Sequence, residues 1–163
     1  MTDSPLALNA PSTSFLIRPV TPQDAEPLQQ NCWTTRSTAG IIHLINRAQQ
    51  NTRRKRGLGA VVIEPETGLP LGFGQLILWS ECGEISDLIV AESQRRRGIG
   101  TAIIQYLIQY AREINLSCVE IGVALSNPNA LRLYRYLGFK DNYTLSLDIG
   151  NGTEPILYLK LLV

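Results

Sequence analysis

The sequence predicts a single α/β domain, in which a mixed and mostly antiparallel sheet of six to seven strands carries about four helices on its two faces. Short apolar runs bounded by turn residues predict the strands, and longer segments with apolar residues every three or four positions predict the helices. The chain has 163 residues and is 44% hydrophobic, which is enough for one sizeable core. No internal repeat or linker-like stretch divides it.

The opening segment is predicted to be a flexible tail. Residues 1–13 contain Pro and Ser but neither a basic start nor a long apolar stretch, so they do not resemble a signal peptide. The domain is expected over residues 14–163. No apolar run approaches a membrane-spanning length, which favours the cytoplasm and gives no reason to expect a membrane partner.

The first half of the domain is expected to begin with one strand and two helices. Phe15–Val20 has the pattern of a short strand. Thr21 followed by Pro22 favours a helix start, and this helix is expected to reach Gln30. Apolar residues at helical spacing predict a second helix over Ser37–Thr52.

A basic run, Arg53-Arg54-Lys55-Arg56, closes the second predicted helix. Cations suit the negative end of a helix dipole, so a solvated helix end is the favoured interpretation. A patch that binds an anionic substrate is the alternative.

Three strands and a long helix are predicted next. The strands are expected at Leu58–Ile63, Leu71–Trp79 and Glu84–Val90, with turn residues between them. The segment Ile99–Ile114 keeps apolar residues at three- and four-residue steps throughout, so one face of this helix must lie against the sheet.

The end of the chain is predicted to add three strands and one shorter helix. The strands are expected at Ser117–Ala124, Tyr143–Ile149 and Ile156–Leu162, the last two joined around Asn151-Gly152. The helix is expected over Asn129–Leu137, where Gly138 ends it.

Overall charge and cysteine usage exclude several classes of function. The formal net charge of +1 gives no electrostatic reason to expect a nucleic acid partner. Three cysteines, Cys32, Cys82 and Cys118, are too few and too widely separated for a disulfide framework or a metal site. Cys82 and Cys118 lie in apolar strand-like runs, which favours buried thiols, and no metal is expected.

The segment with most chemical information is Arg95-Arg96-Arg97-Gly98-Ile99-Gly100, between a predicted strand and a predicted helix. The first turn of a helix offers N–H groups without intrahelical partners, and its dipole favours anions. Glycines let a diphosphate approach those groups closely, and arginines add donors that match phosphate oxygens. The sequence therefore predicts a diphosphate-binding loop.

Two familiar phosphate loops do not fit this segment. It has no Gly-Lys-Ser/Thr triplet, which excludes the P-loop. The dinucleotide fingerprint needs a third glycine, and position 103 is Ile. The remaining alternative is an ordinary turn with surface arginines, which the strand-loop-helix context disfavours.

These residues resemble the GNAT superfamily of coenzyme A-dependent N-acetyltransferases, whose loop reads Gln/Arg-x-x-Gly-x-Gly/Ala. A second similarity is the stretch Asn127-Pro128-Asn129-Ala130-Leu131-Arg132-Leu133-Tyr134, followed by Leu137-Gly138-Phe139. The resemblance is most specific over Glu84–Lys140, and the order of elements extends it over nearly the whole chain. It implies the GNAT fold, with a bulged strand that splays from its neighbour, and acetyl-CoA as cosubstrate without a metal.

The resemblance also implies a set of cofactor-binding residues. Main-chain groups exposed by the splayed strand would pair with the pantetheine arm, the loop and helix start would hold the diphosphate, and one Asn side chain would contact the cofactor. The residues at these positions are Leu88, Ile89, Val90, Arg95, Arg96, Arg97, Gly98, Ile99, Gly100, Thr101 and Asn127. Asn127 has a competing role as the N-cap ahead of Pro128.

Two catalytic residues are expected from the same resemblance. Tyr134 matches the position proposed to protonate the departing thiolate, although it also belongs to an apolar stripe on which it could simply pack. Glu84 matches the glutamate used by the histone-acetylating branch and is the first candidate for the general base. Glu120 on the next strand is the second, and a water is the third. Position 122, which matches the position of a glutamate in bacterial ribosomal-protein acetyltransferases, is Gly here.

Strict alternation along the strand before the loop would place Glu84, Ser86, Leu88 and Val90 on one face, and Ile85, Asp87 and Ile89 on the other.

Residues of the first helices and nearby strands are candidates for the acceptor pocket. The residues expected to line this pocket are Trp33, Arg36 and Trp79, although their spacing in the sequence gives no support for that role. The single His43 lies among apolar residues of the second helix, and a partly buried structural histidine is favoured over a catalytic one.

The expected function is acetyl transfer from acetyl-CoA to a primary amine within a ternary complex. A non-catalytic module that binds or senses coenzyme A is the alternative, and an interaction protein without cofactor is the third hypothesis. The acceptor is left open between a small molecule and a protein N-terminus or lysine. A longer acyl group and a homodimer are also left open.

Overall fold

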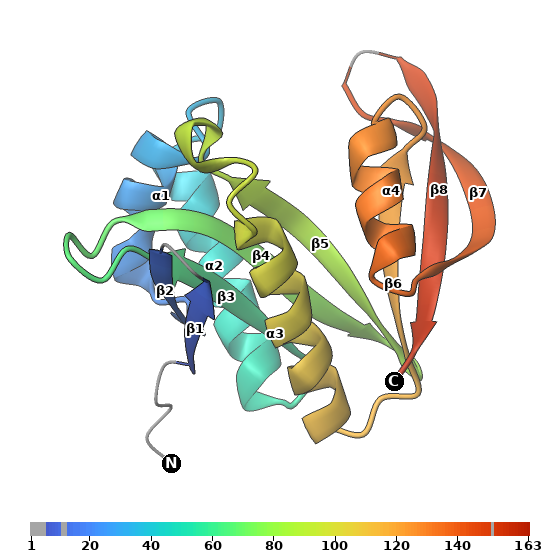
Figure 1. Cartoon of the computed structure of the whole chain (residues 1–163), viewed down its shortest axis with the longest axis horizontal. Helices are drawn as coiled ribbons and strands as arrows, with labels where there is room; N and C mark the ends of the chain where they lie inside the picture. The colour runs from blue at the N-terminus through green and yellow to red at the C-terminus, as the bar shows by residue number, and fades with distance from the viewer. Residues whose placement is uncertain (1–5, 11–12, 151) are drawn as a thin grey trace.

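The computed structural model describes residues 6–10, 13–150 and 152–163. Within these residues an eight-stranded sheet carries two helices on each face (Figure 1). The elements are, in chain order, β1 (Leu6–Ala10), β2 (Thr13–Pro19), η1 (Pro22–Asp24), α1 (Ala25–Asn31), α2 (Thr38–Arg53), β3 (Gly57–Ile63), β4 (Pro70–Trp79), β5 (Cys82–Val90), η2 (Glu92–Gln94), α3 (Ile99–Glu113), β6 (Cys118–Ala124), α4 (Pro128–Tyr136), β7 (Lys140–Asp148) and β8 (Thr153–Leu162).

The strand order in the sheet is β1-β2-β3-β4-β5-β6-β8-β7. Every neighbouring pair is antiparallel except β5 and β6, which run parallel. The connection between these two strands contains α3, as a parallel crossover requires. The seven predicted strands and four predicted helices are all present, and the mixed, mostly antiparallel sheet is confirmed.

The N-terminal strand β1 is an addition to the predicted fold. Residues 1–13 were expected to be a flexible tail, but Leu6–Ala10 pair with β2 in an antiparallel hairpin and Thr13 already belongs to β2. The pairing uses the hydrogen-bonding groups at the free edge of β2, which the sequence of the tail does not reveal. Residues 1–5 and 11–12 of the predicted tail lie outside the described residues.

The first predicted helix is divided into η1 and α1. Thr21 precedes η1, as expected, and its N–H donates to Asp24 Oδ2 at 2.8 Å. Asp24 is buried and also accepts two hydrogen bonds from Arg18, at 2.7 and 2.8 Å. A buried carboxylate with these partners fixes the start of the helix on the sheet.

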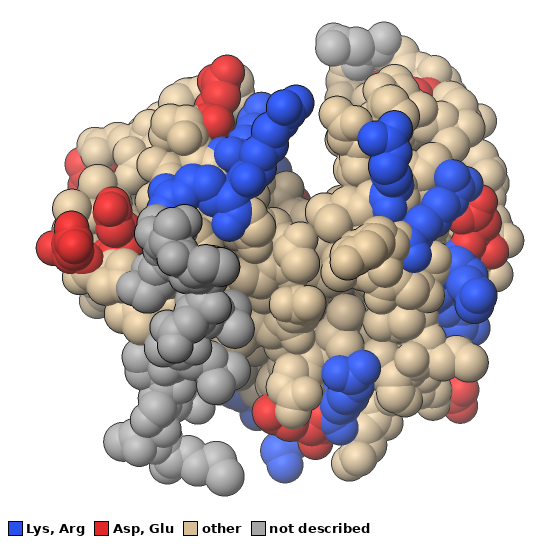
Figure 2. Space-filling view, viewed as in Figure 1, with Lys and Arg blue, Asp and Glu red and all other residues tan. Residues whose placement is uncertain are grey.

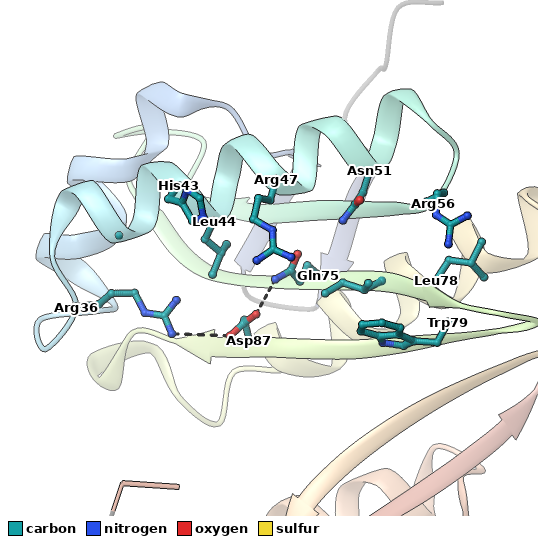
Figure 3. Close-up of a pocket in the computed structure, with 12 residues that line it drawn as sticks. Arg36, His43, Leu44, Arg47, Asn51, Arg56, Gln75, Leu78, Trp79 and Asp87 are labelled. Atoms are coloured by element: carbon teal, nitrogen blue, oxygen red, sulfur yellow. Dashed lines mark hydrogen bonds and ion pairs between the residues drawn. The ribbon is translucent and has the colours of Figure 1, made fainter. Parts of the chain in front are cut away.

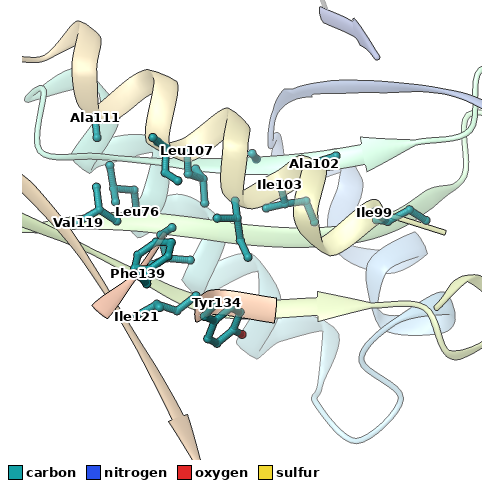
Figure 4. Close-up of a cluster of buried hydrophobic side chains, with 14 of the residues drawn as sticks. Leu76, Ile99, Ala102, Ile103, Leu107, Ala111, Val119, Ile121, Tyr134 and Phe139 are labelled. Carbon is teal, nitrogen blue, oxygen red and sulfur yellow. The ribbon is translucent and has the colours of Figure 1, made fainter. Parts of the chain in front are cut away.

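Two apolar clusters flank the sheet. The larger one lies between the sheet and the α3 side, where Ile103 and Leu107 are completely buried and Tyr134 and Phe139 approach from the other half of the molecule (Figure 4). The smaller cluster joins α1 and α2 to the opposite face. The apolar stripe predicted for α3 therefore faces the sheet, as its periodicity requires.

Strands β5 and β6 part after a short common segment. They pair only from Cys82–Ile85 to Cys118–Ile121, whereas the other edge of β6 pairs with β8 along the whole strand (Figure 1). Residues 86–90 of β5 thus have no partner strand on the β6 side. This is the splayed strand pair that the resemblance implied, and it confirms that part of the predicted fold.

A disulfide joins Cys82 and Cys118 at the closed end of this parting. The prediction of two buried thiols was wrong. The parallel register places the two residues opposite each other, with their Cα atoms 4.6 Å apart, although 36 positions separate them in sequence. A pairing of this kind depends on strand register, which the spacing of cysteines does not give.

The third cysteine, Cys32, is a free and half-buried thiol, and burial raises its pKa to about 11.

Candidate active site

The loop before α3 adopts the geometry of an anion cradle. Arg96 and Gly98 both have left-handed backbone conformations, with φ of 66° and 79°, and Gly98 is the N-cap of α3. The first intrahelical hydrogen bond described at this end runs from Ala102 N–H to Gly98 O at 3.0 Å. The N–H groups ahead of Ala102 therefore point out of the helix end, where a phosphate can accept from them.

The two glycines of the loop are required for different reasons. Gly98 needs its positive φ, which a side chain would strain. Gly100 does not have a positive φ, and a Cβ added there would meet only Val90 Cγ2, at an ordinary 3.8 Å. The protein itself therefore leaves room for a side chain at position 100. A closely approaching ligand is the physical reason that remains for glycine in the first turn of a helix, where alanine would be more stable.

A cavity of about 520 Å³ opens at this helix end. Its walls come from β5, from the loop and first turn of α3, and from α4 across the gap. The lining residues are Leu88, Ile89, Val90, Gln94, Arg95, Arg96, Gly98, Ile99, Gly100, Thr101, Asn127, Asn129, Ala130, Leu133 and Tyr134. In the space-filling view a hollow separates the two halves of the molecule, and basic side chains gather on one wall (Figure 2).

The structure brings together almost all of the predicted cofactor-binding residues. The exception is Arg97, whose guanidinium lies 5.3 Å from the centre of the Phe15 ring and donates to Gln94 Oε1. Arg97 does not line the cavity, because residues on either side of it take left-handed backbone conformations that turn its side chain toward the domain core. Arg95 and Arg96 remain as the cationic side chains of the loop.

Four lining residues were not among the predicted binding residues: Gln94, Asn129, Ala130 and Leu133. Three of them, Asn129, Ala130 and Leu133, belong to α4. They line the cavity only because α4 packs on the side opposite β5 and α3. The apolar stripe of α4, which the sequence does show, was the available signal.

Asn127 is the N-cap of α4, which was the alternative to a cofactor-binding role. Its Oδ1 accepts a hydrogen bond from Ala130 N–H at 3.2 Å, which caps α4 ahead of Pro128. Asn127 also lines the cavity. The capping bond uses the oxygen, so a ligand contact would fall to the amide N–H donors, and both roles are compatible.

Tyr134 lies in the wall of the cavity opposite the loop. Only 8% of the residue is exposed, and its ring packs against Phe139 with centroids 6.4 Å apart (Figure 4). Burial raises the pKa of the Tyr134 phenol above its ordinary value of 10.0. The side chain therefore remains protonated at neutral pH beside the parted strands. This position is compatible both with packing and with proton donation.

Glu84 lies on β5 just before the parting. Its Oε2 accepts a hydrogen bond from the indole N–H of Trp79 at 2.9 Å. Burial raises the pKa of Glu84 above its ordinary 4.5, the Trp79 hydrogen bond opposes this, and the carboxylates of Glu120 and Asp87 reinforce it. A carboxylate whose pKa is raised toward neutrality is suited to accept a proton from an amine.

Glu120, the second base candidate, is directly opposite Glu84 in the parallel register. Its Oε2 accepts a hydrogen bond from Tyr143 at 3.1 Å, and the Tyr143 ring stacks on Tyr158 with centroids 5.0 Å apart. Burial, together with Glu120, raises the pKa of Tyr143 to about 12. Glu120 is thus engaged by a phenol that stays protonated, whereas Glu84 is engaged by the Trp79 indole. Both carboxylates line a cavity of about 300 Å³ beside Cys82 and Cys118.

The Tyr158 ring also explains the glycine at position 122. A Cβ added to Gly122 would lie 3.0 Å from Tyr158 Cε1 and 3.2 Å from Ile156 Cγ2. The space that a glutamate would need there is occupied by a neighbouring strand.

A bulge in β5 changes which residues share a face. Asp87 has a left-handed φ of 54°, and the β4–β5 register shifts there, between the Gln75–Ser86 and Phe73–Ile89 pairs. The extra residue inverts the alternation, so Leu88 and Val90 pack with the α3 cluster together with Ile85. The prediction that strict alternation places Glu84 and Leu88 on one face was therefore wrong.

The bulge places two consecutive residues of β5 beside cavities on opposite faces of the sheet. Leu88 lines the cavity beside α3 and α4. Asp87, the next residue, lines a second cavity of about 470 Å³ between α2 and the strands β4 and β5 (Figure 3). Two consecutive residues of β5 therefore line the two cavities, one on each face of the sheet.

Two of the three residues named for the acceptor pocket line this second cavity. Arg36 and Trp79 do so, but Trp33 is buried in the core, 5.2 Å from Phe73 between ring centroids, with the Arg36 guanidinium 5.0 Å above its ring. His43 also lines the cavity and is exposed, so the expectation of a partly buried histidine was wrong. Among the described residues, no group of three or more His, Cys, Asp or Glu side chains is arranged to hold a metal.

Residues 23–139, which form most of the chain, match the family model of the acetyltransferase (GNAT) family. The chain belongs to the GNAT family. An N-alpha-acetyltransferase of Sulfurisphaera tokodaii is 36% identical over 76 residues, which are 46% of this chain and 46% of that protein. The curated relatives that match the chain are covered over only 27% to 51% of their own lengths.

Solved GNAT structures resemble the whole fold. RimJ of Mycobacterium smegmatis in complex with CoA-disulfide has a TM-score of 0.82 at 16% identity, covering 98% of this chain and 87% of the other. A putative acetyltransferase of Salmonella typhimurium with acetyl-CoA has a TM-score of 0.75 at 18% identity, covering 91% and 93%. At these identities the likeness concerns the fold.

Proposed function

We propose that the chain is an N-acetyltransferase that moves an acetyl group from acetyl-CoA to a primary amine by direct transfer in a ternary complex. The observation that carries this proposal is the cavity at the N-terminal end of α3. There, outward-facing N–H groups, two arginines and an unhindered glycine face the exposed edge of β5. The solved GNAT relative that contains acetyl-CoA supports the choice of ligand.

The residues of the cavity suit the successive parts of acetyl-CoA. The N–H groups at Gly98–Thr101, with Arg95 and Arg96, would bind the diphosphate. The unpaired main chain at Leu88–Val90 would pair with the pantetheine arm as a partner strand does. This pairing would leave the thioester near the bulge, whose consecutive residues Asp87 and Leu88 line the two cavities.

The proposed transfer needs three proton movements. Glu84, directly or through a water, accepts a proton from the ammonium, which has no lone pair until it loses one. The amine nitrogen then bonds to the acetyl carbon while main-chain N–H groups of β5 stabilise the oxyanion. As the carbon–sulfur bond breaks, the attacking nitrogen gives its second proton to water, which leaves a neutral amide. Tyr134 donates its proton to the departing thiolate. The phenol regains a proton from solvent.

Calorimetry with acetyl-CoA and a thiol-release assay over a panel of amines test this proposal. We expect acetyl-CoA to bind, and free thiol to appear only when an amine is present. The variant Gly100→Ala should retain or gain stability, because alanine favours helix, and should bind acetyl-CoA about tenfold more weakly. Binding without amine-dependent thiol release from any amine would favour the non-catalytic module, and absence of binding would contradict both.

A further inference from the structure

The second cavity, between α2 and the strands β4 and β5, has a strongly basic lining. Arg36, Arg47 and Arg56 line it, and Asp87 is its single carboxylate. These four side chains leave a formal surplus of two positive charges in a molecule whose overall charge is only +1. The surplus is therefore a local feature of this cavity, which opens at one face of the sheet (Figure 3).

The one carboxylate of the cavity is already engaged within the protein. Asp87 Oδ2 accepts a hydrogen bond from Gln75 Nε2 at 2.6 Å, and Asp87 Oδ1 lies 3.9 Å from Arg36 Nη2. Within the described part of the chain, no carboxylate lies within 4.0 Å of the side-chain nitrogens of Arg47 or Arg56. Arg47 points from α2 into the cavity toward Gln75 (Figure 3). The N–H donors of its guanidinium are thus available to an external anion.

The cavity adjoins the place where the proposed transfer would occur. Asp87 belongs to its lining, and the next residue, Leu88, lines the cavity for acetyl-CoA. Trp79 also lines the basic cavity and donates to Glu84, the proposed base. Trp79 also lines the smaller cavity of about 300 Å³ that contains Glu84. A molecule that lies against Trp79 can therefore present one end to Glu84 and the other to the arginines of the basic cavity.

We propose that the acceptor is a primary amine whose own molecule carries a carboxylate, and that Arg47 binds this carboxylate while the amine lies at Glu84. The proposal rests on the proposed function and names the acceptor class of the same site. The guanidinium forms paired, charge-assisted hydrogen bonds with a carboxylate, and Arg56 adds a second positive charge on the same wall. Polyamines and other polycations would meet like charges in this cavity.

Two sources can supply this chemistry, a free amino dicarboxylate or a peptide with an acidic N-terminal residue. Thiol release from acetyl-CoA should be measured with matched acceptors that differ only in charge. One arm compares glutamate with glutamine, a second compares the peptide Asp-Ala-Ala with Asn-Ala-Ala, and spermidine is the cationic probe. We expect the acidic member of at least one pair to have a kcat/KM about tenfold higher than its amide, and spermidine to be the poorest acceptor.

The variants Arg47→Gln and Arg56→Gln locate the source of the preference. Arg47→Gln should abolish the acid-over-amide ratio, and Arg56→Gln should reduce it. The control is Arg54→Gln, which removes a charge from the end of α2 at an exposed residue outside the cavity lining. This control should leave the ratio unchanged. Thermal unfolding of each variant checks that the fold is retained.

Equal use of acids and amides, a preference for spermidine, or a ratio that survives Arg47→Gln would overturn the proposal while leaving acetyl transfer itself intact. If acetyl-CoA binds but none of these amines releases thiol, calorimetry tests directly whether the basic cavity binds a carboxylate. Glutamate and Asp-Ala-Ala are then titrated into the protein loaded with coenzyme A. Binding that requires Arg47 supports the anionic site, and absence of binding overturns it. Failure of acetyl-CoA to bind at all instead contradicts the proposed function.

Discussion

Tyr134 combines two properties that a proton donor to sulfur needs. The residue lies in the wall of the cavity, and burial raises the pKa of its phenol, so the hydroxyl carries its proton at neutral pH when the thiolate forms beside it. Its ring also packs on Phe139, so the hydroxyl can be tested separately from the packing of the side chain.

The variant Tyr134→Phe should lower kcat about a hundredfold while leaving the affinity for acetyl-CoA nearly unchanged, because it removes the hydroxyl and keeps the ring. Steady-state kinetics and calorimetry provide the two measurements. Tyr136→Phe is the matched control, since Tyr136 belongs to the same helix but is 86% exposed and outside the cavity. Unchanged turnover in Tyr134→Phe would remove the acid role.

Glu84 is expected to give the reaction an acidic limb in its pH profile. Because burial raises the pKa of Glu84 above 4.5, kcat/KM should fall as the pH drops through that raised value, at a higher pH than an ordinary carboxylate would give. Glu84→Gln should lower kcat about a hundredfold or more and remove this limb. A limb that persists in the variant would assign the base to another group.

The stability of the Glu84→Gln variant gives an independent check. A raised pKa in the folded state means that the contribution of Glu84 to stability is present at acid pH and is lost as the pH rises through the folded pKa. At neutral pH the amide should therefore be tolerated at least as well as the carboxylate. Urea unfolding of the two proteins at pH 5 and pH 8 tests this sign.

At the scale of elements, β5 organises the site. Its first residues pair with β6 and residues 86–90 do not, so one strand supplies the proposed base, the bulge and the exposed main chain. The disulfide of Cys82 and Cys118 lies at the closed end of the parting and holds the two strands in register there.

The double variant Cys82→Ser/Cys118→Ser should lower the free energy of unfolding by about 2–4 kcal/mol, because the crosslink restricts the unfolded chain. Urea unfolding measures this change. Cys32→Ser is the control, since Cys32 is a free thiol. A reducing agent should affect the wild type and this control, but not the double variant. Equal stability of the double variant and the wild type would contradict a structural role for the disulfide.

At the scale of the whole molecule, the cavity divides the domain into two halves. One wall belongs to β5 and α3, and the other to α4, which packs on the β6–β8 side (Figure 1). A ligand between these walls replaces the contacts that a continuous sheet would make. Binding should therefore stabilise the assembly of the two halves and not only the loop.

We expect acetyl-CoA at a hundred times its dissociation constant to raise the free energy of unfolding by about 2.7 kcal/mol, and the melting temperature by several degrees. Thermal unfolding with and without ligand measures this. Pantetheine, which lacks the diphosphate, should give a much smaller shift at the same concentration. An equal shift with pantetheine would show that the N-terminal end of α3 does not provide the diphosphate site.

Local patterns account for most of what could be predicted. The apolar stripe of α3, the loop before it and the turn residues are properties of adjacent positions, so strands β2 to β8 and all four helices were found. The position of the Arg97 side chain outside the cavity could not be predicted, because the backbone angles of the loop orient each side chain differently and a motif does not encode them. The face of Leu88 was wrong because one inserted residue at Asp87 inverts the alternation.

The sequence by itself determined the family, the order of elements and the loop that suits a diphosphate, since each depends on residues that are neighbours along the chain. Only the tertiary structure decided the Cys82–Cys118 disulfide, the extra strand β1 and the basic cavity of Arg36, Arg47 and Arg56. The physical reason is the same in each case. Strand register and helix packing bring together residues that are far apart in sequence, and charges that are balanced over the whole chain become unbalanced in one cavity.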